Sequence, residues 1–197
     1  MKEWHAACEA MRCGRQTVLL RKGGIADAQK GAFEIRSTAF ALFPTNFHVD
    51  AEVLAREEFE ALASLRAPDM KLGERVRLSL IARVTGAWIV DGDRGLEALR
   101  ALKGYHCWSE ALQETRLAYK PKTALTILEL RAYECAAGDE MTLEADLERY
   151  GGCKSWIDID PWTPAALRPC VSDEDFAQRG ARLRADLESL GATNALK

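Results

Sequence analysis

The residues of this chain that could do chemistry are mainly cations beside glycines and aromatic rings. Arg21 and Lys22 follow an apolar, β-rich segment and precede Gly23 and Gly24. Glycines let a backbone approach a ligand closely, and neighbouring cations attract phosphate or another anion. These four residues are a candidate anion contact. The alternative is an ordinary exit turn from a strand.

A second basic segment holds Arg116, Lys120 and Lys122, with Tyr119 inside it and Trp108 shortly before it. Cations of this kind bind phosphate, and aromatic rings can stack on bases. Together with Arg21 and Lys22 they favour binding of nucleic acid or a nucleotide-like anion. The alternative is that the cations only keep the chain soluble and the rings lie in the core.

Further polar residues could shape a pocket beside these cations. A loop between a predicted strand and a predicted helix carries Thr45, Asn46 and His48, and such junctions are common places for binding sites. The complete set of pocket candidates is Thr45, Asn46, His48, Trp108, Tyr119, Lys154 and Trp156.

A nucleophilic enzyme is the second function class. Cys153 follows two glycines and precedes Lys154, whose charge could lower the pKa of the thiol. His48 or His106 could act as its base. The opposing interpretation is a small core cysteine, so the sequence leaves open whether the chain is an enzyme.

Other chemistries lack their motifs. No phosphate-binding G-x-x-x-x-G-K-[ST] or G-x-G-x-x-G segment occurs, and no Glu or Gln is followed two residues later by Lys, as a metal-dependent restriction nuclease would need. The three histidines form no i, i+4 pair. We therefore expect no metal and no cofactor.

The bulk properties are those of one globular domain. The chain has 197 residues, 48% hydrophobic and 29% charged, with a net charge of −3. Residues 1–48 carry seven Lys or Arg and four acids, whereas residues 134–197 carry thirteen acids and seven bases. A polyanion site therefore belongs in the first two thirds of the chain, and the acidic C-terminal helix is a third candidate, as a docking surface for a protein partner.

Apolar runs and cysteine spacing indicate where in the cell the protein is expected. The first residues show no long apolar run, and no segment reaches the ~18 apolar residues of a membrane span. The six cysteines are irregularly spaced. We expect reduced thiols, a cytoplasmic protein and no membrane partner.

The elements that must position these residues alternate irregularly between helix and strand. Period and capping predict helices at 2–12, 50–66, 94–103, from Ser109, and at 142–150, and strands at 16–21, 32–43, 74–90 and 124–135. Gly86 should break or bulge the third strand. Residues 154–159 should be extended. Ser172 and Gly191 bound a C-terminal helix over 172–191.

This order predicts an α+β fold in a single domain over 1–197. The sheet should be mixed but mostly antiparallel, flanked by helices, and could curl into a partial barrel.

Six blocks resemble one known family. They are "KEWHAACEA" at 2–10, "LLRKGGI" at 19–25, "FALFPTNFH" at 40–48, "HCWSE" at 106–110, "LRAYE" at 130–134 and "GCKSW" at 152–156. In this order they resemble the domain-of-unknown-function 1802 family of prokaryotes, over nearly the whole chain. The resemblance implies no reaction. Some members are similar in context to restriction systems with a Mrr-type endonuclease domain, which implies nucleic acid or a restriction-system component as partner.

Overall fold

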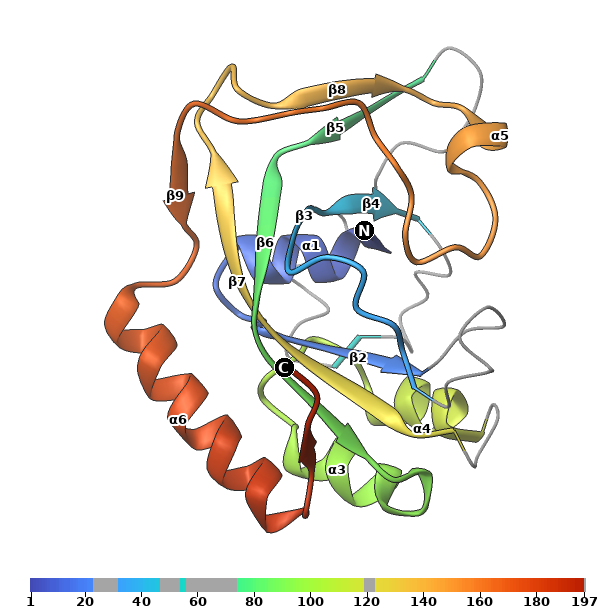
Figure 1. Cartoon of the computed structure of the whole chain (residues 1–197), viewed down its shortest axis with the longest axis vertical. Helices are drawn as coiled ribbons and strands as arrows, with labels where there is room; N and C mark the ends of the chain where they lie inside the picture. The colour runs from blue at the N-terminus through green and yellow to red at the C-terminus, as the bar shows by residue number, and fades with distance from the viewer. Residues whose placement is uncertain (23–31, 47–53, 56–73, 119–122, 197) are drawn as a thin grey trace.

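A long antiparallel strand pair, β6 (Leu80–Val90) with β7 (Leu125–Cys135), forms the centre of the fold (Figure 1). The computed structural model describes residues 1–22, 32–46, 54–55, 74–118 and 123–196. Both strands are rich in Leu, Ile and Val, which favour the pleated backbone.

Each half of this strand pair has different neighbours. At one end β6 pairs with β3 (Ala39–Ala41) and β7 pairs with β9 (Leu167–Pro169). At the other end β6 pairs with β10 (Thr193–Asn194) and β7 pairs with β2 (Val18–Lys22). All these pairs are antiparallel, and β2 is an edge strand.

The sheet is buried on both faces where β2, β6 and β7 meet. One face packs on α1 (His5–Arg12) through Leu128 and Leu130 of β7, in the same cluster as Met11. The opposite face presents Ile127 to a cluster that contains Leu99 and Leu183. These belong to α3 (Gly95–Ala101), which follows the turn η1 (Gly92–Arg94), and to α6 (Asp173–Ser189).

A bulge in β6 separates the two halves of the strand pair. Val84 pairs with Leu130 and Gly86 pairs with Glu129, so Thr85 is the extra residue. A Cβ at Gly86 would lie 2.2 Å from an atom of the Trp88 ring, so the ring occupies the space that a larger residue would need. The predicted break at Gly86 is therefore a bulge within one strand.

Two short sheets complete the β structure. β5 (Arg75–Leu78) pairs with β8 (Met141–Glu144), and this pair lies beyond the β6–β7 pair at the top of Figure 1. β1 (Lys2–Trp4) pairs in parallel with β4 (Phe43–Thr45). The short helix α5 (Leu147–Tyr150) begins where Asp146 Oδ1 accepts a hydrogen bond from the Arg149 N–H at 2.9 Å.

Helix α6 lies along the outside of the sheet (Figure 1). Ser172 caps it by accepting a hydrogen bond from the Asp175 N–H, and Gly191 follows its end with a φ of +63°. Gly180, Leu183 and Leu187 are its buried face. No large hydrophobic side chain of α6 is exposed, which gives the proposed docking surface on this helix no support.

The α+β prediction and the mostly antiparallel strand pairing are confirmed, and the parallel pair of β1 with β4 forms a sheet of its own. Among the described residues the strands do not close into a barrel. No helix in this part of the chain is both long and apolar enough to cross a membrane.

Several predicted boundaries were wrong for one reason, the competition of strand pairing with helical period. Residues 2–4 pair with β4 and delay the first helix to His5. Residues 141–144 pair with β5, which leaves only Leu147–Tyr150 as helix. Leu54 forms an antiparallel bridge with Trp108 where a helix was expected, and the rest of 50–66 lies outside the described residues.

Candidate anion-binding groove

Two neighbouring cavities lie beside the edge strand β2, and they share Arg21 and Ser155. The first, of about 390 Å³, is lined on its polar side by Arg21, Lys22 and Arg116. The second, of about 250 Å³, is lined by residues of β1 and of the segment 152–155. We call the two together the cationic groove. Its charged lining residues are Lys2, Glu3, Arg21, Lys22, Arg116 and Lys154.

The two cations of β2 are held by different partners. Arg21 donates from Nη2 to Glu3 Oε2 at 2.7 Å and to the Lys2 carbonyl at 3.0 Å. Lys22 Nζ donates to the Leu117 carbonyl at 2.8 Å, in the last turn of α4 (Glu110–Ala118). A cation is favourable at a helix C-terminus, so α4 holds this ammonium in place. Burial lowers the pKa of Lys22.

Arg116 lies on two tryptophan rings. Its guanidinium carbon is 4.5 Å from the Trp4 ring centroid and 5.4 Å from that of Trp108. The two rings meet edge to face, with centroids 4.8 Å apart. Cation–π attraction of this kind holds a guanidinium without neutralising it.

No hydrogen-bond acceptor or ion-pair partner contacts the Arg116 guanidinium within the described residues. Burial lowers its pKa, the nearby Glu3 charge raises it, and the Arg21 charge lowers it again. Since charged groups away from water are usually paired, an unpaired, half-buried guanidinium in a cavity wall is the strongest sign of a ligand site here.

Glu3 is the acid in the groove lining, and it is already engaged. Its side chain is 5% exposed, Oε1 accepts from the Trp4 N–H at 2.8 Å, and Oε2 accepts from Arg21. It therefore neutralises Arg21 and positions the start of α1. The other cations of the lining keep the groove positive.

The second cavity is bounded by the loop after α5. Lys2 Nζ donates to the carbonyls of Tyr150 and Gly152, at 2.7 and 2.8 Å. Burial lowers the pKa of Lys2, Cys153 raises it and Lys154 lowers it. Cys153 and Lys154 are both exposed at the cavity, so Cys153 is not the core cysteine of the opposing interpretation.

His106 lies in a different cavity, lined also by Arg100, Lys103 and Trp108. It is 8% exposed, and its Nδ1 accepts from the Trp108 N–H at 3.2 Å. Burial lowers its pKa to about 4. No contact between His106 and Cys153 occurs in the described part of the chain, so this nucleophile–base pair has no geometric support. The alternative with His48 lies outside the described residues.

The remaining pocket candidates separate into three groups. Thr45 lines the second cavity and donates from Oγ1 to the Glu3 carbonyl at 3.1 Å. Trp108 is 3% exposed and supports Arg116, so its ring is closed to base stacking, and Trp156 packs on Phe33 and Phe40. Asn46 lies at the end of β4 and lines neither cavity of the groove.

The other predicted site residues lie outside the described residues: Gly23, Gly24, His48, Tyr119, Lys120 and Lys122. Within the described ranges no cluster of three His, Cys, Asp or Glu side chains is close enough to hold a metal ion.

Sequence reasoning missed Lys2, Glu3 and Gln113 as groove residues. Lys2 and Glu3 reach β2 only because β1 pairs with β4, a contact between segments forty residues apart. Gln113 had a weak signal, because it is a polar residue one helical turn before Arg116 and so shares its face of α4.

Comparison with known families gives one match. A family model described as "Domain of unknown function (DUF1802)" matches residues 1–182 of the 197, so the chain belongs to this family. No curated protein matches the chain, and no solved structure matches it.

Proposed function

We propose that this member of the family is a non-catalytic binding module for the phosphate of nucleic acid or of a nucleotide-like anion, held in the cationic groove. The observation that carries the proposal is Arg116, a half-buried guanidinium with aromatic support and no acceptor among the described residues. A guanidinium presents five N–H donors in a plane that matches the oxygens of a phosphate.

The groups around Arg116 favour a phosphate from another molecule as its partner over a carboxylate of the chain itself. Lys22 is anchored on the Leu117 carbonyl, in the turn next to Arg116, so two donors of fixed position face one cavity. Because α4 and the tryptophan pair already hold them, little side-chain entropy is lost when an anion binds.

The charge of the groove is local. The chain as a whole carries a net charge of −3, whereas five cations and one acid line the groove. Low-dielectric walls concentrate the field of such a cluster and attract anions. We therefore expect binding in the groove without general binding of polyanions over the surface.

The test is a titration of labelled single-stranded and double-stranded DNA and RNA oligonucleotides, from low to high salt. We expect binding at low salt with a slope of log affinity against log salt of about −2, as for roughly three phosphates on a single strand. Arg116→Gln should weaken binding about tenfold or more, since hydrogen bonds to charged groups contribute about 1.5–3 kcal/mol.

The matched control is Arg182→Gln, which removes the same charge from an exposed position on α6. It should change affinity by less than twofold. Absence of binding at low salt, or equal losses in the two variants, would contradict the proposal. A restriction-system component as partner stays a prediction, because no contact in the described chain bears on it.

A further inference from the structure

The larger cavity of the cationic groove has an apolar interior behind its charged edge. Its walls include the leucines of β2, α3, α4 and β7: Leu20, Leu99, Leu117 and Leu125. Arg21, Lys22 and Arg116 supply the cations. The volume of about 390 Å³ falls within the range of about 300–1,000 Å³ typical of small-molecule sites. An inorganic phosphate alone would contact only the charged edge of this cavity.

One polar group in this wall is unusual. Gln113 is 4% exposed, so its amide lies almost entirely out of bulk water. The amide nitrogen is 2.9 Å from His106 Nε2 and 3.4 Å from the Trp108 carbonyl. Its Oε1 is buried and has no hydrogen-bond partner.

A buried polar atom without a partner costs about 1–3 kcal/mol, so it needs an explanation. His106 is neutral at physiological pH because burial lowers its pKa to about 4, and since Nδ1 accepts from the Trp108 N–H, its one ring proton lies on Nε2. This N–H can be donated only to the amide oxygen of Gln113, so whichever way the amide is turned, one of its two ends is left without a hydrogen-bond partner. The amide keeps hydrogen-bonding capacity that the surrounding side chains do not use. A ligand that enters the cavity can use it.

We propose that this cavity receives the base of one nucleotide, with its phosphate on Arg116 and Lys22 and with Gln113 bonding the base edge. The inference rests on the proposed function, and it names the unit that binds and the residue that selects it. The leucine walls suit the flat apolar faces of a heterocycle. A glutamine amide offers one acceptor and two donors, the combination that base edges complement.

The neighbouring cavity that holds His106 is a weaker candidate for the base. Its lining cations are Arg15, Arg100 and Lys103, and Arg100 is paired with Glu110, with Nε to Oε1 at 3.3 Å. The larger cavity of the groove combines the apolar walls, the unpaired Arg116 and the amide in one place. The neighbouring cavity shares Gln113 and Leu99 with it but is not lined by Arg116, so the larger cavity is the better place for a base and its phosphate together.

The experiment is isothermal titration calorimetry with the four ribonucleoside monophosphates, ribose 5-phosphate and inorganic phosphate. We expect at least one nucleotide to bind about tenfold tighter than ribose 5-phosphate, with a preference among the bases. Gln113→Met, of similar volume, should reduce that preference to less than twofold and keep the affinity for ribose 5-phosphate. Arg116→Gln should weaken all ligands by a similar factor.

Thr115→Trp is a second variant with less risk to folding, because Thr115 is exposed and lines the same cavity. Its ring should fill the cavity and remove nucleotide binding while inorganic phosphate still binds. Equal affinities for ribose 5-phosphate and every nucleotide, or an unchanged base preference in a folded Gln113→Met protein, would overturn the inference.

The two proposals fail in different ways. If no phosphate ligand and no oligonucleotide binds, the proposed function is wrong. If phosphate and oligonucleotides bind but a base adds nothing, only the base pocket is wrong. The affinities of a monophosphate and of a 5′-phosphorylated trinucleotide distinguish two sources of the bound nucleotide. Similar affinities indicate a free nucleotide, and tighter binding of the trinucleotide indicates the end of a strand.

Discussion

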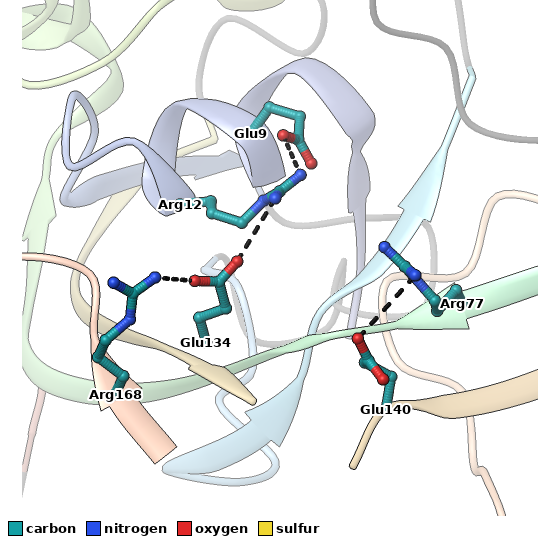
Figure 2. A network of polar contacts seen from close by, with 6 residues as sticks. All are labelled: Glu9, Arg12, Arg77, Glu134, Glu140 and Arg168. Atoms are coloured by element: carbon teal, nitrogen blue, oxygen red, sulfur yellow. Dashed lines mark hydrogen bonds and ion pairs between the residues drawn. The ribbon is translucent and has the colours of Figure 1, made fainter. Parts of the chain in front are cut away.

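Two regions of the molecule hold arginines in opposite ways. Between α1, β7 and β9, Arg12 contacts Glu9 and Glu134, and Arg168 contacts Glu134 as well (Figure 2). In the cationic groove, Arg116 rests on two aromatic rings and contacts no carboxylate among the described residues. The same residue type is therefore paired with carboxylates in one place and held by aromatic rings in the other.

This difference distinguishes arginines that stabilise the fold from an arginine that can bind a ligand. In the ion-pair network Glu134 of β7 joins α1 to β9, which are distant in sequence, whereas Glu9 pairs with Arg12 within α1. Figure 2 shows a further pair, Arg77 with Glu140, at 3.9 Å. Such pairs fix one arrangement of elements. An arginine held only by rings keeps all its N–H donors for another molecule.

The largest expected effect is a pH dependence of stability from His106, whose ring contacts Gln113 of the groove. The pKa of His106 falls from 6.5 to about 4 on folding because the ring is buried, so below pH 6.5 the unfolded chain binds a proton that the folded chain lacks. Stability is therefore full above pH 6.5 and falls by about 1.4 kcal/mol per pH unit, or about 3 kcal/mol by pH 4.

Urea unfolding at several pH values checks this prediction, with His106→Gln and His5→Gln as comparison variants. Burial also lowers the pKa of His5, beside Glu9 and Arg12, so it acts in the same direction. The His106 variant should flatten the curve more. A larger flattening from the His5 variant would place the pH sensitivity in the ion-pair network instead.

Second in size is the loss of stability when an arginine becomes methionine. Arg12→Met leaves the buried Glu9 without its cation, and we expect a loss of about 2 kcal/mol, below the value for fully buried pairs since Arg12 is partly exposed. Arg116→Met should cost less than about 1 kcal/mol, because it removes ring contacts but also a desolvated charge. Equal losses of unfolding free energy in the two variants, measured with urea, would contradict the proposed difference between the two regions.

A milder change to the network should give a smaller loss. Glu134→Gln keeps the shape and the acceptor but removes the charge shared by Arg12 and Arg168, and we expect about 1 kcal/mol less stability. Nucleotide affinity should stay within twofold, because Glu134 does not line the groove. A change in affinity would show that the two regions are coupled.

The smallest expected effect is a gain of affinity. Glu3→Gln removes the acid of the groove lining but keeps an oxygen for the Trp4 N–H, so Arg21 gains attraction for an anion. We expect oligonucleotides to bind two- to fivefold tighter at low salt, as a moderate Coulomb effect. Glu97→Gln, on the exposed pair with Arg94, is the control and should have no effect. Weaker binding in Glu3→Gln would mean that Arg21 needs its carboxylate to face the ligand.

The sequence predicted the parts of the fold that depend on local pattern. Hydrophobic alternation located β7 within a residue, and the Ser172 cap and Gly191 located α6. It failed where long-range pairing decided the backbone, as at β1 and β8. The groove divides in the same way: cations beside glycines marked Arg21 and Lys22, and a basic segment marked Arg116. Nothing local could show that Trp4 and Trp108 would both support Arg116, since their contact depends on the tertiary fold.

The extra residue of the β6 bulge decides which side chains of β6 face each side of the sheet. Before it, the even-numbered Leu80 and Ala82 pack on the α1 face; after it, the even-numbered Trp88 and Val90 pack on the α3 and α6 face. Deleting Thr85 would remove that switch and turn one half of the strand inside out. The length of this segment is therefore under tighter constraint than its composition, and in any chain of the same architecture a one-residue gap here should be accompanied by an exchange of apolar and polar positions along the rest of the strand.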